Sequence, residues 1–259
     1  SVSLNGATDV SNFFLSLSQI SQDGIIPTNA DSYNKYTFSA RASHKVNNLT
    51  FSTSLNYAYQ RNNFVSTGQK SSSMYNNVMQ TPRDISIVEL KDLNNPFNTN
   101  PYYVLNNFKN EFESERFYGK LQLDYDFLKY FKLTYRFGLD TSTEHHDMGE
   151  PNMSTLFKGT PNWEDALRSL TGRVSEQTTR RREINQDLLV TFDKDLTDSW
   201  HINALVGFNG NERKYSYQSS EITNLTIPTW LNLANTADKP TIKSYQRIQR
   251  LMGALGQAE

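Results

Sequence analysis

The sequence lacks several features by which a protein class is usually recognised. None of its 259 residues is a cysteine, so neither a disulfide framework nor a thiolate metal site is present. The net charge is −1, and the only basic cluster, Arg180 to Arg182, is followed at once by Glu183. We therefore predict that this cluster is a solvated strand end and that the chain does not bind nucleic acid, which requires clustered basic charge.

Long apolar runs are absent as well. No stretch approaches the roughly 18 consecutive apolar residues that a transmembrane helix needs, and the first residues do not resemble a signal peptide. Only 36% of the residues are hydrophobic, yet there are 14 tyrosines and 15 phenylalanines. A nearly neutral chain with this aromatic content is not expected to be disordered.

The strongest positive signal is an alternation of apolar and polar residues along many segments. From Phe117 to Phe127, for example, the odd positions are apolar or glycine and the even positions are mostly polar or charged. Similar rows run from Tyr36 to Val46, from Leu49 to Tyr59, from Phe131 to Leu139 and from Trp200 to Phe208. A period of two is typical of β-strands, and about nine such strands are expected.

The connections between these strands fall into two classes that alternate along the chain. Short connections are predicted at Gly6 to Val10, Asn47 to Asn48, Leu128 to Tyr130 and Lys194 to Ser199. Long ones are predicted at Ser21 to Ser32, Asn62 to Glu115, Met148 to Thr179 and about Ser219 to Ser244. All eight prolines lie in the long connections. Tight turns at one rim and large loops at the other are typical of an outer-membrane β-barrel.

Alternation alone fits a soluble β-sandwich equally well, but three further features favour a membrane barrel. Aromatic residues gather at the ends of the apolar rows, where a barrel places its interfacial girdles. Charges lie inside the polar rows, and one loop exceeds fifty residues. The in-strand charges are Arg41, Lys120, Asp124, Arg136, Asp140 and Asp187. We therefore predict an all-β fold, an antiparallel transmembrane β-barrel segment with long extracellular loops, each strand crossing with roughly 9–11 residues.

Three passages resemble one family. They are NFFLSLSQISQDGIIP at 12–27, TPRDI at 81–85 and NPYYVLNNFKNEFESERFYGKLQLDYDF at 100–127. Together with the strand order they resemble the SusC/RagA group of TonB-dependent outer-membrane transporters, over essentially the whole chain. The resemblance implies a multi-pass protein of the bacterial cell outer membrane that imports nutrients.

The resemblance also implies partners and missing parts. Residues 1–259 would be a partial barrel domain, because a barrel of this class has about 22 strands around a plugged lumen. The plug, the N-terminal extension with its TonB-contacting segment and the rest of the barrel would lie outside this sequence. A SusD-like surface lipoprotein would act as a lid, outer-membrane lipid would surround the wall, and the substrate would be an oligosaccharide or a peptide.

Catalytic chemistry is not expected. The sequence contains no phosphate-binding glycine loop, no nucleophile elbow and no zinc-protease motif, so we predict no catalytic residue, no enzyme activity and no cofactor. His145 and His146 are adjacent and would point to opposite faces of a strand, so they are not expected to share a metal. We predict no metal site.

The most interesting candidates are aromatic residues in the long loops. Tyr102, Tyr103, Trp163 and Trp230 are the candidates for contact with the substrate or the lid, because aromatic rings stack on sugars and pack on peptides. Structural anchoring within folded loops is the more ordinary explanation for the same residues.

Two other readings remain open at the level of sequence. One is a soluble or surface all-β binding protein whose sheets pack on each other. The other is a barrel that serves in adhesion and transports nothing. The location of the aromatic rows distinguishes the soluble binding protein from a barrel, because they would be buried in a soluble protein and exposed to lipid in a barrel.

Overall fold

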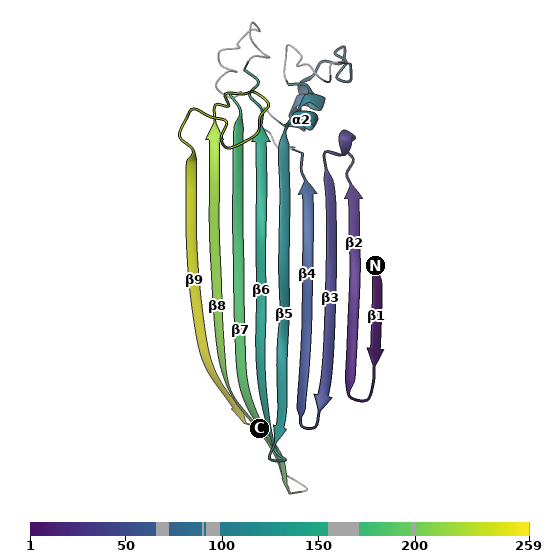
Figure 1. Ribbon diagram of the computed structural model, residues 1–259, viewed down its shortest axis with the longest axis vertical. Coiled ribbons are helices and arrows are strands. Elements are labelled where there is room, and N and C mark those ends of the chain that lie inside the picture. The colour runs from purple at the N-terminus through teal and green to yellow at the C-terminus, as the bar shows by residue number, and fades with distance from the viewer. Residues whose placement is uncertain (66–72, 90, 92–98, 155–170, 198–199, 259) are drawn as a thin grey trace.

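The computed structural model shows one antiparallel sheet in which nine strands pair in sequence order (Figure 1). The structure describes residues 1–65, 73–89, 91, 99–154, 171–197 and 200–258. The strands are β1 (Val2–Ala7), β2 (Ser11–Asp23), β3 (Ser32–Val46), β4 (Leu49–Asn63), β5 (Lys109–Phe127), β6 (Phe131–Glu150), β7 (Arg173–Thr197), β8 (Trp200–Thr223) and β9 (Thr241–Ala258). The helices are a 3-10 turn, η1 (Pro27–Asn29), and two short α-helices, α1 (Met74–Gln80) and α2 (Pro101–Asn107). The predicted all-β class and number of strands are confirmed.

Short and long connections lie at opposite ends of the sheet, as predicted. The turns 8–10, 47–48 and 128–130 join strands at the lower end in Figure 1, and both α-helices lie at the upper end with the long loops. Among the described residues six prolines occur, and all of them lie outside the strands. The sheet therefore has one rim of tight turns and one rim of large loops.

The strands are longer than the sequence pattern predicted. β5 has 19 residues, β6 has 20, β7 has 25 and β8 has 24, whereas a tilted crossing needs roughly 9–11. The excess lies toward the long loops, in segments such as 109–116 and 173–183 that were predicted wholly or partly as loop. Both faces of these segments are polar, so they carry no alternation from which pairing could be predicted.

The register places the apolar rows of all the strands on one face. Leu55 of β4 pairs with Ala40 of β3 and with Gly119 of β5, and Leu188 of β7 pairs with Tyr135 of β6 and Phe208 of β8. Because directly paired residues point to the same side of a sheet, these rows merge into one surface. We call it the outer face, and the opposite one the inner face.

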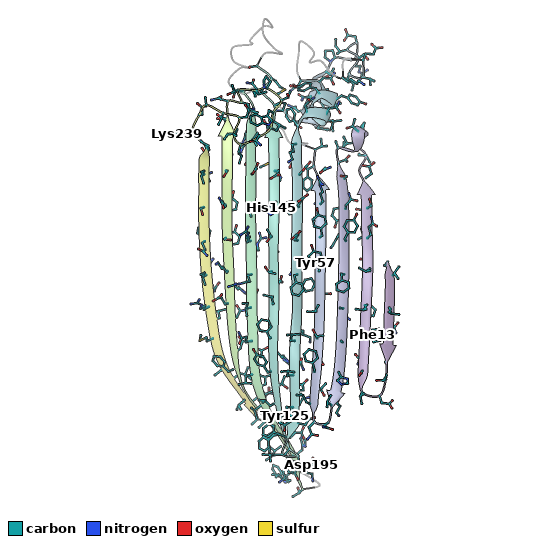
Figure 2. The ribbon with its side chains drawn as sticks, in the orientation of Figure 1. Phe13, Tyr57, Tyr125, His145, Asp195 and Lys239 are labelled. Atoms are coloured by element: carbon teal, nitrogen blue, oxygen red, sulfur yellow. The ribbon has the colours of Figure 1, made fainter. Side chains whose placement is uncertain are left out.

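The outer face carries an apolar belt that is confined to the half of the sheet near the short turns. Figure 2 shows Tyr125 close to the short-turn end, Tyr57 farther up and His145 nearer the long loops. Many belt side chains are exposed, among them Leu17 at 62% and Val206 at 60%. The belt comprises Phe13, Leu15, Leu17, Phe38, Phe51, Leu55, Leu121, Leu123, Leu133, Phe137, Leu188, Val190, Val206 and Phe208.

Aromatic rings border the belt at both edges. At the lower edge the rings of Phe127 and Phe131 stack with centroids 5.6 Å apart, and Phe131 lies 4.9 Å from Phe192. At the upper edge Tyr36 stacks on Tyr59 at 6.4 Å. Ten residues separate Phe117 from Phe127 along β5, which is a path of about 33 Å and a height of about 25 Å at the tilt usual for barrel strands. That height matches the apolar band of an outer-membrane barrel.

The buried apolar residues lie in the loops and strand tops and not under the sheet. Val174, Ile222 and Leu225 form a buried cluster at the long-loop end, covered by Leu231 and Leu233 of the loop after β8. None of the helices in the described residues is long and apolar enough to cross a membrane. The main hydrophobic surface of the sheet is therefore the exposed belt.

Candidate functional site

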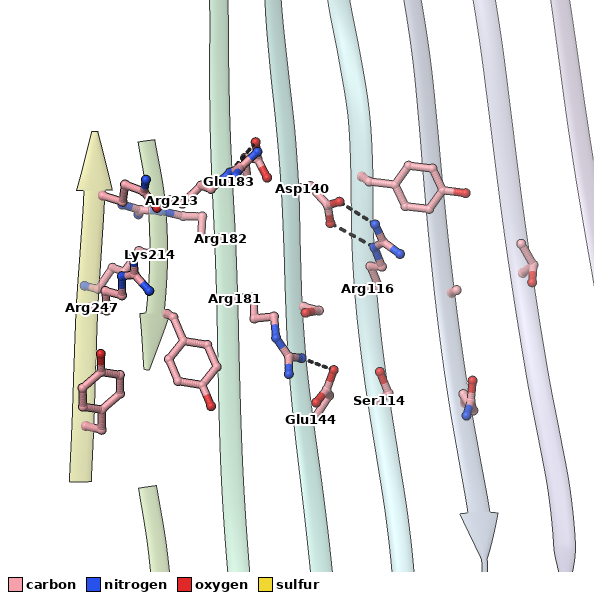
Figure 3. Close-up of a pocket in the computed structure, with 18 of the residues that line it drawn as sticks. Ser114, Arg116, Asp140, Glu144, Arg181, Arg182, Glu183, Arg213, Lys214 and Arg247 are labelled. Carbon is pink, nitrogen blue, oxygen red and sulfur yellow. Dashed lines mark hydrogen bonds and ion pairs between the residues drawn. The ribbon is translucent and has the colours of Figure 1, made fainter. Parts of the chain in front are cut away.

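A broad hollow lies on the inner face of the sheet. It has a volume of about 850 Å³ and is lined by residues from β3 through β9 (Figure 3). Lys35 and Thr37 of β3 share this hollow with Arg247 and Gln249 of β9. Strands six positions apart can line one hollow only if the sheet curls, so the inner face is the concave one.

Ion pairs between neighbouring strands orient the arginines of the hollow. Arg116 makes two parallel bonds to Asp140, from Nε to Oδ1 at 3.0 Å and from Nη2 to Oδ2 at 2.6 Å. Arg181 pairs with Glu144, and Nε of Arg213 lies 3.0 Å from Oε1 of Glu183. These side chains are between 27% and 57% exposed, and such pairs add little to stability. Their effect is to fix the planar guanidinium groups in place.

Tyrosine rings lie beside two of these arginines. The guanidinium of Arg116 is 5.0 Å from the centroid of the Tyr118 ring, and that of Arg181 is 5.7 Å from the ring of Tyr215. Tyr215 in turn lies 6.0 Å from Tyr245, with the two rings tilted by 55°. The arrangement holds charge and aromatic surface side by side, which suits contacts with polar ligands and with peptide or sugar surfaces.

The hollow carries an excess of positive charge. Five basic side chains of the inner face line it, from Lys35, Arg116, Arg181, Arg213 and Arg247, against three carboxylates. Within the described residues Lys35 and Arg247 have no carboxylate partner. The hollow is therefore a polar surface with donors available to an acceptor-rich ligand.

Below the hollow the inner face remains polar down to the short turns. Asp124, which is only 9% exposed, accepts hydrogen bonds from the Thr134 hydroxyl at 2.6 Å and from Gln122 at 2.7 Å. Farther along the sheet, Asn209 donates to Asp187 at 2.5 Å and to Asn185 at 3.0 Å. These ladders confirm that the in-strand charges of the sequence face away from the apolar belt.

The basic run at Arg180 to Arg182 was interpreted wrongly as a strand end. It lies inside β7, where successive side chains point to opposite faces. Arg181 joins the inner hollow through Glu144, and Arg182 bonds Glu212 on the outer face at 3.0 Å. The error arose because this part of β7 is polar on both faces.

The aromatic loop candidates occupy different environments. Tyr103 of α2 is 8% exposed, and burial raises the pKa of its phenol above the usual value, whereas Tyr102 is half-buried. The Trp230 side chain is 46% exposed. Trp163 lies outside the described residues. The structure brings Tyr102 and Tyr103 together on one helix, and their role in binding stays a prediction.

The loop that carries Trp230 is held by one asparagine. Asn235 is 2% exposed and donates to the carbonyl oxygens of Ile227 and Trp230, both at 2.7 Å, while its own side-chain oxygen accepts from the backbone N–H of Ile227 at 2.9 Å. The backbone around Trp230 is thereby fixed while the ring remains accessible.

The two adjacent histidines face opposite sides of β6, as predicted. His145 bonds the Thr178 hydroxyl at 3.1 Å on the outer face, and His146 bonds Asn110 at 2.8 Å on the inner face beside the ring of Phe112. No group of three or more metal-ligating side chains occurs among the residues that the structure describes.

Comparison with known proteins gives a likeness of fold. No protein-family model matches the chain, and no curated protein matches it. Among solved structures it resembles the RagAB peptide importer in its open-open state, with a TM-score of 0.73 and 14% identity over 99% of this chain. The closed-closed state gives a TM-score of 0.69 over 95% of the chain, also with 14% identity.

A more distant match has the same architecture. The ferripyoverdine receptor of the Pseudomonas aeruginosa outer membrane aligns with 99% of the chain at a TM-score of 0.56 and 12% identity. The chain spans 28% of the matched RagAB chains and 32% of the receptor. This chain therefore has the fold of a run of barrel strands from the TonB-dependent outer-membrane transporters.

Proposed function

We propose that the chain forms part of the wall of a SusC/RagA-like, TonB-dependent nutrient importer in the bacterial outer membrane. The observation that carries this proposal is the division of one curled sheet into an exposed apolar belt outside and a charged, concave face inside. A large exposed apolar surface between aromatic girdles is stable in lipid and a liability in water.

The inner face supports a role in passage and not in covalent chemistry. Most of its charged side chains are paired with one another across strands, and among the described residues that line the hollow no nucleophile and base are in contact. We therefore propose no enzyme activity, and we propose an oligosaccharide or a peptide as the transported substrate. The Arg and Tyr side chains of the hollow fit the carboxylates, amides and hydroxyls of either class.

The barrel is completed, in this proposal, by parts of the polypeptide outside this chain. β1 and β9 each pair with one neighbour in the described sheet and not with each other. An unpaired strand edge in lipid costs several kcal/mol for each unsatisfied group, so further strands must cover both edges. The plug and the TonB-contacting segment would belong to the same remaining parts.

The long loops are the proposed site of a SusD-like lipoprotein lid. They lie together at one end of the sheet with α1 and α2, and they present the half-exposed ring of Trp230. Tyr102, Tyr103 and Trp163 remain candidates for contact with the lid or the substrate.

Energised uptake tests the proposal. In cells that lack the complete protein, accumulation of labelled oligosaccharides or peptides should be lost, and it should return when the gene is restored. Because TonB draws on the inner-membrane proton gradient, a protonophore should abolish uptake in the restored cells as well. A soluble or adhesive surface protein predicts unchanged uptake in both arms, and that outcome would contradict the importer.

A further inference from the structure

We propose that the outer face of β6 to β9 holds a binding groove for an anionic lipid, with a phosphate-bearing headgroup at the upper edge of the apolar belt and acyl chains below. The inference rests on the proposed membrane position of the belt. It concerns the outer face, to which the register assigns Arg182 and Lys214, although both residues also border the hollow from the other side of the sheet.

The groove is a recess of about 500 Å³ in the lipid-facing surface. Gly210 opens it, because a Cβ built at this position would meet only one atom within 4 Å, Cε1 of Phe208 at 3.9 Å. Its outer-face lining consists of Tyr135, Ile184, Gln186, Leu188, Phe208, Gly210, Glu212, Arg250 and Met252.

Basic charge collects at the upper end of the groove. Glu212 is bonded by Arg182 at 3.0 Å and by Arg250 at 2.7 Å, and Lys214 stands opposite Arg182 in the register of β7 and β8. The Arg250 side chain is 68% exposed. Two guanidinium groups thus share one carboxylate, with a lysine on the same face two residues farther along β8. Because each guanidinium has five N–H donors, most donors remain available to a phosphate.

The polarity of the groove falls along its length in the same order as that of a lipid, from charged headgroup through polar linkage to acyl chain. Below the charges, the Tyr135 hydroxyl donates to the side-chain oxygen of Gln186 at 3.3 Å, at a level suited to ester or amide linkages. Below these polar groups lie Leu188 and Phe208, which belong to the belt and suit an acyl chain. Charge, hydrogen-bonding groups and apolar surface therefore follow one another downward.

Other outer-face features of the described sheet lack this combination. A groove of similar size near β1 to β4, lined by Leu17, Tyr36, Phe38 and Tyr57, contains no basic residue. The ion pairs of Arg61 and Lys109 lie higher on the sheet and are shared with Glu111, Glu113 and Asp147, so acids outnumber bases there. Charge complementarity thus favours a negative headgroup at β7 to β9.

The test measures lipid retention by native mass spectrometry. The complete protein, purified from outer membranes in mild detergent, is exchanged into micelles containing phosphatidylglycerol or phosphatidylcholine. The wild type should retain phosphatidylglycerol preferentially. Replacing Arg182→Gln and Arg250→Gln together should weaken that retention by about fivefold for each arginine, the usual effect of one basic residue near an anionic lipid surface. Arg61→Gln, which removes a comparable outer-face arginine, should change nothing.

A second pair of variants tests the recess itself. Gly210→Leu should fill the groove and reduce retention of either lipid. Gly256→Leu is the control, because Gly256 of β9 also lies on the outer face but has open space around it, and this change should leave lipid retention unaltered. Excess inorganic phosphate should fail to displace the lipid. Equal retention of both lipids by the wild type, equal losses in the Arg61 control, or displacement by free phosphate would each overturn the proposal. If any of these results is obtained while energised uptake by cells that carry the protein is intact, the lipid site fails and the importer stands.

Discussion

At the scale of single residues, neighbours in the same strand meet different surroundings. Leu123 lies in the apolar belt and is 40% exposed, while Gln122, the preceding residue, points inward and donates to Asp124. Both lie near the middle of the belt along β5. Because the two positions lie at the same depth in the bilayer, the same substitution at each measures the effect of facing lipid and not the effect of depth.

Leu123→Arg should destabilise the complete barrel strongly. An arginine on the lipid face near the bilayer midplane costs about 2–4 kcal/mol. Gln122→Arg stays on the polar inner face, where Asp124 offsets the repulsion from Arg136 opposite it, and should cost less than about 1 kcal/mol. Urea unfolding of the refolded protein in lipid vesicles measures both free energies. Equal losses at the two positions would contradict the assignment of faces.

Alternation was sufficient to predict these faces but not the pairs that form on them. The contact of Arg181 with Glu144 depends on the register between β6 and β7, which is set across a loop of more than twenty residues. Nothing local in the sequence specifies it. The only sign of the inner hollow in the sequence was therefore the presence of charged residues, such as Asp140 and Lys120, inside the polar rows.

At the scale of elements, the short turns must reverse the chain within two or three residues, which forces unusual backbone angles. Leu128 and Lys129, between β5 and β6, both have positive φ angles, of 50° and 54°. Residues other than glycine and asparagine adopt this left-handed region at a cost of roughly 1–2 kcal/mol. The turn thus stores strain that a glycine would relieve.

Lys129→Gly should raise the stability of the barrel, by up to about 1 kcal/mol once the greater freedom of glycine in the unfolded chain is subtracted. Lys45→Gly, which removes the same charge from an extended position in strand β3, should lower it by about 0.5–1 kcal/mol. Denaturant midpoints of the two variants give the comparison. A destabilising Lys129→Gly would mean that the turn is not strained.

Strand existence was predictable and strand length was not. The belt portions of β5 to β8 alternate cleanly, and so do their short turns, because one face must meet an apolar medium. Above the belt both faces are wet, as at Arg180 on the outer face and Arg181 on the inner face of β7, and pairing continues there through backbone hydrogen bonds that any polar side chain permits. Alternation of apolar and polar residues shows only which face meets water, so it cannot predict strand pairing where both faces meet water.

At the scale of the whole molecule, the account depends on which face of the sheet meets lipid. The absence of cysteine from this chain makes that question directly measurable, because single cysteines can be introduced without background from these residues. β7 is the most informative strand, since it runs through the belt from Ile184 to Phe192 and continues well above it.

The most direct measurement is a spin-label scan of residues 180–192 in the complete protein, reconstituted in lipid vesicles, recording accessibility to oxygen and to a water-soluble nickel reagent. The account predicts high oxygen accessibility at the even positions from 184 to 192, low values at the odd positions between them, and access of the nickel reagent at 180 and 182. Nickel access at 188 and 190, or no alternation along the strand, would show that the belt does not face lipid and would contradict the barrel wall proposed for this chain.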